Sequence, residues 1–79
     1  MRVTYDERAN AVYVYLVKEI RPGGVRETVR ATADVNVDIG SDGQVLGIEV
    51  LNAREIVPEL VTEALDGQQA KAQAQKLQG

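Results

Sequence analysis

The stretch that decides the fold is Asp34-Val35-Asn36-Val37-Asp38-Ile39-Gly40-Ser41-Asp42-Gly43-Gln44-Val45-Leu46-Gly47-Ile48-Glu49-Val50-Leu51. Apolar and polar residues alternate on both sides of Asp42-Gly43. An Asp-Gly pair between two alternating runs is a strong signal for a β-hairpin. Gly43 suits a turn position that requires a positive φ angle.

The alternation also predicts the register of this hairpin. With Asp42 and Gly43 as the two turn residues, three apolar pairs share one face of the sheet: Ile39 with Leu46, Val37 with Ile48, and Val35 with Val50. The opposite face receives Asp38 with Gly47, Asn36 with Glu49, and Asp34 with Leu51. A shift of one residue would mix the apolar and polar sets, so the pattern favours this register.

Residues 2–5, 11–17 and 25–31 are shorter strand candidates before the hairpin. Pairing the first two across a polar turn places Tyr5 opposite Val12 and Val3 opposite Val14. Leu16 then joins the apolar face, whereas Tyr13, Tyr15 and Val17 lie on the other face. Residues 25–31 alternate weakly, which is typical of an exposed strand near an edge.

A helix is predicted after the hairpin. Asn52 is a favoured N-cap residue, and Glu55 completes a capping-box pair. The apolar residues that follow repeat with the helical period: Ile56, Val57, Leu60, Val61, Ala64 and Leu65. Pro58 divides this segment into a short turn over residues 53–56 and a helix that begins at Pro58. Gly67 is the expected end of the helix.

These elements predict a two-layer α+β domain. It consists of an antiparallel β-meander of four or five strands with a C-terminal helix packed on one face. Residues 1–67 form the domain, and residues 68–79 form a polar Gln/Ala/Lys tail that we expect to be flexible. The helix is expected to cover the apolar strand residues Val12, Val14, Leu16, Val35, Val37, Ile39, Leu46, Ile48 and Val50.

Composition argues against several classes of function. The chain has 79 residues, a net charge of −3, and neither cysteine nor histidine. Disulfides, Cys/His zinc sites and Cys–His or Ser–His nucleophile pairs are therefore excluded. The acidic charge argues against nucleic-acid binding, and no apolar run approaches the ~20 residues of a membrane span. We expect a cytoplasmic protein without catalytic activity, cofactor or metal.

Two blocks of the sequence carry a family resemblance. The first is Val3-Thr4-Tyr5-Asp6-Glu7 with Ala11-Val12-Tyr13-Val14-Tyr15-Leu16. The second is Val37-Asp38 with Asp42-Gly43-Gln44-Val45-Leu46-Gly47-Ile48-Glu49-Val50-Leu51-Asn52-Ala53. Together they are similar to the pattern of the small bacterial and archaeal proteins catalogued as domain of unknown function 2283. Asn10, Asn52 and Arg54 depart from that pattern.

The resemblance implies no activity, because none is established for that family. The small size of its members and their pairing with small toxin-like proteins imply an accessory or antitoxin-like binding partner. This implication agrees with the absence of the usual catalytic residues.

The polar sheet face supplies the candidate interaction surface. Tyr13 and Tyr15 lie on it among charged and polar residues, a composition typical of interfaces. The candidate residues are Tyr13, Tyr15, Arg26, Arg30, Asn36, Asp38 and Glu49. We expect a homodimer or an unidentified protein partner to bind there. The alternative is a small-molecule or anion binding module on the Tyr13/Tyr15 face, with Arg26 and Arg30.

Carboxylates on the same face raise two further hypotheses. Asp34, Asn36 and Asp38 have the spacing of the start of an EF-hand loop, but Ile39 and Val45 occupy the positions that require Gly and Glu. Strand alternation explains the spacing, so no metal site is predicted. Asp38 and Glu49 could form the acid–base pair of a minimal hydrolase. A solvated sheet face is the simpler interpretation.

Overall fold

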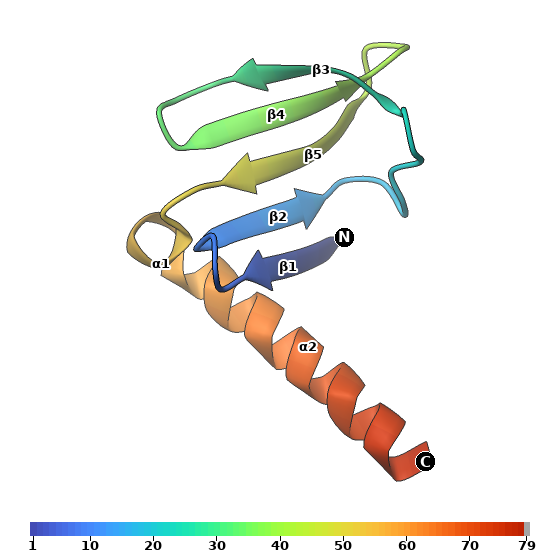
Figure 1. The fold of residues 1–79 in the computed structure, drawn as a ribbon, viewed down its shortest axis with the longest axis vertical. Helices are drawn as coiled ribbons and strands as arrows, with labels where there is room; N and C mark the ends of the chain where they lie inside the picture. Colours follow the sequence, from blue (N-terminus) through green and yellow to red (C-terminus); the bar gives the residue numbers. More distant parts are fainter. Residues whose placement is uncertain (79) are drawn as a thin grey trace.

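The computed structural model describes the backbone of residues 1–78 and the side chains of residues 1–69. Five strands and two helices follow one another along this part of the chain (Figure 1). They are β1 (Arg2–Asp6), β2 (Ala11–Tyr15), β3 (Val25–Arg30), β4 (Val35–Gly40), β5 (Val45–Val50), α1 (Ala53–Ile56) and α2 (Pro58–Gln78). The predicted α+β class, with an antiparallel sheet and a C-terminal helix, is confirmed.

The sheet has the strand order β1-β2-β5-β4-β3 (Figure 1). The meander is therefore correct within β1–β2 and within β3–β4–β5, but β2 pairs with β5 rather than with β3. This pairing places Val12 opposite Val50 and Val14 opposite Ile48, which brings the most apolar strands to the centre. Residues 16–24 carry the chain to the far edge, where β3 is exposed along its whole length.

The register predicted for the central hairpin is confirmed from Val35 to Asp38. The loop, however, has three residues rather than two, because Gly40 N–H donates to the carbonyl oxygen of Gln44. Gly43 closes the loop with φ of 84°, as its position predicted. Ile39 consequently pairs with Val45, and a β-bulge before it restores the predicted register for the rest of the hairpin.

The junction between the sheet and α1 differs from the predicted capping box. Asn52 has the left-handed φ of 51° and makes no side-chain cap. Its amide donates instead to Asp34 Oδ1 at 2.8 Å. Asn10, also left-handed, accepts the Arg54 N–H through Oδ1 at 3.1 Å and donates to Glu55 Oε2 at 2.9 Å. A residue 44 positions away therefore performs the capping.

The two faces of the sheet have opposite character. One cross-strand row on the helix side is entirely apolar: Val3, Val14, Ile48, Val37 and Val29. The neighbouring row on the same side is Tyr5, Val12, Val50 and Val35. On the other side the rows are Arg2, Tyr15, Gly47, Asp38, Thr28 and Thr4, Tyr13, Glu49, Asn36, Arg30.

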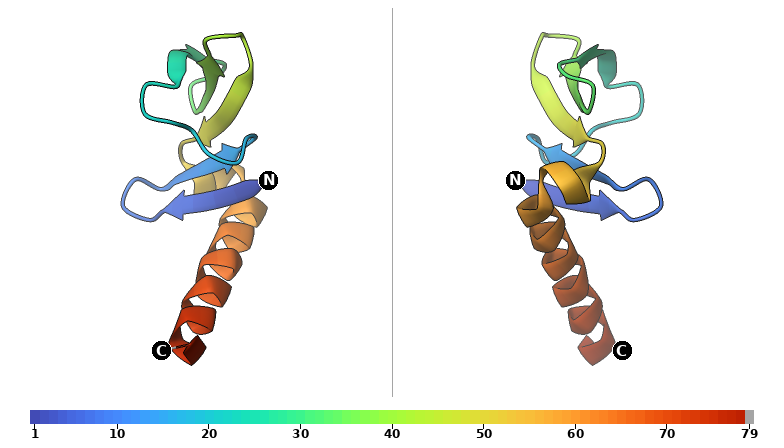
Figure 2. Two further views of the ribbon diagram at one scale, coloured as in Figure 1. Left: turned by 90° about the vertical axis from the view of Figure 1, so that its right-hand side faces the viewer. Right: turned by 90° about the vertical axis from the view of Figure 1, so that its left-hand side faces the viewer.

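Helix α2 covers only one half of the apolar face. It packs mainly on β1 and to a smaller extent on β2, and then continues beyond the edge of the sheet (Figures 1 and 2). The core consists of Tyr5, Val12, Val14, Ala53, Val61 and Ala64. The prediction that the helix covers all the apolar strand residues is therefore wrong. Val35, Val37, Ile39, Leu46 and Ile48 are only half-buried, and Leu16 is exposed.

The end of the helix was also predicted wrongly. Helix α2 passes through Gly67, where an added Cβ would meet no atom within 4 Å, and continues to Gln78. Alanine, glutamine and lysine dominate residues 68–78, and all three are good helix formers. The flexibility expected for residues 68–79 stays a prediction, because side chains from residue 70 onward lie outside the described part of the chain.

Candidate interaction surface

The tyrosine face predicted as an interaction surface is a hydrogen-bonded network within the chain. The Tyr13 hydroxyl donates to Asp38 Oδ2 at 2.6 Å, and the Thr28 hydroxyl donates to Asp38 Oδ1 at 2.6 Å. The Tyr13 ring reaches Asp38 by lying across Gly47, where an added Cβ would collide with the ring. Gly47 therefore provides the space that lets Tyr13 span β5.

This position shifts the ionisation of Tyr13. Desolvation by the surrounding side chains is the main cause that raises the pKa of Tyr13 well above its ordinary value of 10.0. The hydrogen bond to Asp38 and the negative charge of that carboxylate raise the pKa further. Tyr13 is therefore a stable neutral donor, unsuited to proton transfer near neutral pH.

Tyr15 is held in the same network by aromatic and cationic contacts. Its ring centroid lies 4.7 Å from that of Tyr13, with 60° between the planes. The Arg2 guanidinium lies over the Tyr15 ring, 3.9 Å from its centroid. Asn36 donates to Glu49 Oε1 at 3.1 Å, which completes the polar face. The predicted residues Tyr13, Tyr15, Asn36, Asp38 and Glu49 thus share one face, on which Tyr13 binds Asp38 and Asn36 binds Glu49.

The two arginines predicted for this surface do not converge on the tyrosines. Arg26 donates to the Ser41 carbonyl at 3.2 Å and forms an ion pair with Glu27 at 3.1 Å. Arg30 donates to the Ala33 carbonyl at 3.0 Å, at the opposite end of β3. Four residues of strand separate their Cα atoms by about 13 Å. Arg26, Arg30 and the tyrosines therefore do not form a common site for an anion.

The carboxylate pair is likewise divided between separate partners. Asp38 accepts two hydroxyl hydrogen bonds, and Glu49 accepts an amide hydrogen bond. Asp38 faces Gly47 across the ladder, whereas Glu49 faces Asn36. Among the residues that the structure describes, no three acidic side chains gather where they could bind a metal ion. The structure gives no support to acid–base chemistry at this pair.

A second surface lies on the half of the apolar face that α2 leaves uncovered. We name it the open apolar patch, and it consists of Val29, Val35, Val37, Ile39 and Ile48. Burial falls along its row from Val14, which is 9% exposed, to Val29, which is 43% exposed. The row is apolar along its whole length, but only the end near the helix is covered by a second layer. Exposed apolar surface of this kind is typical of a site of protein contact.

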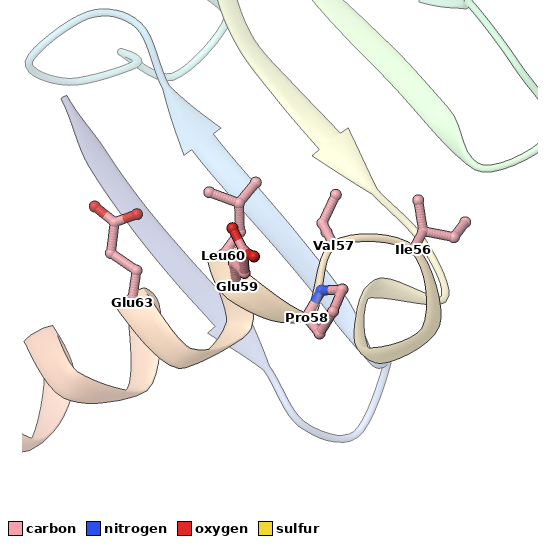
Figure 3. Close-up of a pocket in the computed structure, with 6 residues that line it drawn as sticks. All are labelled: Ile56, Val57, Pro58, Glu59, Leu60 and Glu63. Atoms are coloured by element: carbon pink, nitrogen blue, oxygen red, sulfur yellow. The ribbon is translucent and has the colours of Figure 1, made fainter.

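The junction between α1 and α2 forms a wall beside this patch. Val57 and Leu60 pack against the core cluster next to Ile48, and Ile56 is 46% exposed. These residues line a depression of about 370 Å³ together with Pro58, Glu59 and Glu63 (Figure 3). Val57 and Leu60 pack against the same core cluster as Ile48, which connects this depression to the patch.

The sequence patterns did not reveal the open apolar patch, because they say nothing directly about the width of the sheet relative to that of the helix. Five strands at about 4.8 Å spacing form a sheet roughly 20 Å across, whereas one helix is about 10 Å wide. A single helix can cover only two or three strands. A sequence with five strands and one apolar helical stripe therefore already indicates an uncovered half.

Comparisons with known proteins agree with the sequence resemblance. No curated protein and no solved structure matches the chain. In the described part of the chain, no helix combines the length and apolarity that crossing a membrane requires. A family model matches residues 2–54, which include all five strands and the start of α1. The chain belongs to the family described as Protein of unknown function (DUF2283).

Proposed function

We propose that this protein is a non-catalytic protein-interaction module and that the open apolar patch is its contact surface. One observation carries the proposal: half of the apolar sheet face is left without a covering layer. Antiparallel sheets usually pair an apolar covered face with a polar solvated one. Here the side chains of the polar face form hydrogen bonds within the chain, whereas the apolar face is only partly covered by α2.

The two faces differ in what a partner would gain. On the tyrosine face, a partner would have to compete with the bonds among Tyr13, Asp38, Asn36 and Glu49. On the open apolar patch, each Å² removed from water contributes about 25 cal/mol, and no internal hydrogen bond is lost. The free energy of association therefore favours the patch. Neutralisation of a small toxin-like protein is one form that such binding could take.

A capture experiment with matched variants tests this proposal. The baits are the purified parent, Val29→Lys and Leu65→Lys proteins, each with an affinity tag. Each bait is incubated with a cell extract that also contains the untagged parent protein. Val29 is 43% exposed within the patch, and Leu65 is 45% exposed on a flank of α2 outside it. We expect the parent and Leu65→Lys to retain the same proteins, and Val29→Lys to lose them. Equal retention by all three would contradict the proposal.

A further inference from the structure

We propose that the partner of the open apolar patch is a second copy of this chain, bound patch to patch around a two-fold axis that runs along the strands. This inference rests on the proposed function, because it names the partner of the same surface. Exposed area and shape support it.

The exposed area of the chain matches what a dimer would bury. The chain exposes 5830 Å². A compact monomer of 8.6 kDa would expose about 4,700 Å², which leaves an excess of about 1,100 Å². The uncovered sheet and the part of α2 beyond the sheet share this excess. A standard interface buries about 800 Å² on each partner, so the excess of the whole chain is large enough to supply one.

The shape of the chain allows this face to meet its own copy. Helix α2 stands on the β1–β2 half of the sheet, and the other half is bare. A packed helix layer and a stacked second sheet both lie about 10 Å from a sheet. The step that α2 forms therefore has the height that a second sheet needs to rest on the patch.

The same step determines the direction of the symmetry axis. An axis along the strands exchanges the helix side of one copy with the β3 side of the other. Each α2 then lies beside the β3 edge of its partner, and the two patches are in contact. An axis across the strands would instead place helix against helix and hold the patches about 20 Å apart. Only the first arrangement buries the patch.

Molar mass in solution tests this inference. The purified parent protein is measured by light scattering coupled to size-exclusion chromatography from 10 µM to about 1 mM, a range that covers weak and moderate affinity. We expect a dimer for the parent and for Leu65→Lys, and a monomer for Val29→Lys. Leu65 lies on the opposite flank of α2 from Glu59 and Glu63, so its variant controls for the loss of an exposed apolar side chain. If Val29→Lys does not fold by circular dichroism, Ile56→Lys replaces it.

The outcomes separate this inference from the proposed function. A parent that stays monomeric over this range, or a Val29→Lys variant that dimerises as the parent does, would overturn the second copy as partner of the patch. If that monomer still captured a different protein through Val29, the interaction module would stand and only the dimer would fail. If neither self-association nor capture responded to Val29→Lys, both proposals would be wrong.

Discussion

At the scale of single residues, Gly47 and Tyr13 show how one small side chain organises a whole face. Gly47 is buried at the centre of the sheet, and the Tyr13 ring occupies the space above it. Glycine in a strand interior is usually unfavourable, so its presence here is explained by the aromatic side chain that covers it. The hydrogen bonds of Asp38 depend on this arrangement.

Replacement of Gly47 by alanine should therefore displace the Tyr13 ring and break its bond to Asp38. We expect a loss of about 1–3 kcal/mol in the free energy of unfolding, measured by urea denaturation. Gly67→Ala is the matched control, because nothing lies within 4 Å of its added Cβ. In a helix, that change should raise stability by about 0.5–1 kcal/mol. Equal effects of the two substitutions would refute the role of Gly47.

Tyr13 also predicts how stability responds to alkaline pH. Its pKa in the folded chain is raised above 10.0, so the folded state holds this proton more tightly than the unfolded state does. The contribution of the Tyr13 proton to the free energy of unfolding is fully present below pH 10 and is lost as the pH rises above that value. Unfolding free energies of the parent and of Tyr13→Phe should therefore converge at high pH. A constant difference from pH 8 to 12 would show that Tyr13 ionises no less readily when folded.

At the scale of elements, the junction of the β1–β2 turn with α1 shows what alternation cannot predict. Asn10 accepts hydrogen bonds from the Tyr5 hydroxyl at 2.9 Å and the Arg54 N–H at 3.1 Å. Its carbonyl accepts the Ala53 N–H at 3.0 Å. Local sequence assigns the cap to Asn52, because capping patterns consider only neighbouring residues. The true cap comes from a distant turn that the fold brings into place.

Asn10→Ala should destabilise the protein by about 1–3 kcal/mol, because it removes these side-chain bonds and places alanine at φ of 50°. Asn10→Gly separates the two effects, since glycine adopts that φ without strain. We expect its midpoint in thermal denaturation to lie between those of the parent and Asn10→Ala. A midpoint for Asn10→Gly at or below that of Asn10→Ala would mean that backbone strain contributes nothing.

Alternation predicted the parts of the fold that depend on one face being buried. The register from Val35 to Asp38 follows from it, as does the pairing of Tyr5 with Val12. It could not predict that β2 pairs with β5, because any two valine-rich strands satisfy the same pattern. For the candidate site, it placed Tyr13, Asp38 and Glu49 on one face correctly. It could not show that Tyr13 binds Asp38, because this depends on which side chain reaches across Gly47.

At the scale of the whole molecule, the chain is more extended than its length requires. Its radius of gyration is 13.9 Å. A compact chain of 79 residues would have a radius of about 11.6 Å. Helix α2 runs beyond the sheet while β3, β4 and much of β5 have no layer above them (Figure 1). A chain with so small a core has few ways to gain stability alone, and association is the most direct.

Association of this kind makes stability depend on protein concentration. If the dimer forms only from folded chains, mass action should raise the melting temperature of the parent by about 2–5 °C for each tenfold increase in concentration. Val29→Lys should melt at one temperature throughout the same range, because its patch no longer self-associates. The measurement is differential scanning calorimetry at 20 µM, 200 µM and 2 mM, with Leu65→Lys expected to behave as the parent. A parent whose melting temperature is independent of concentration would show that its stability comes from the single chain. The half-buried patch would then be an energetic cost of the monomer, retained for contact with a different protein.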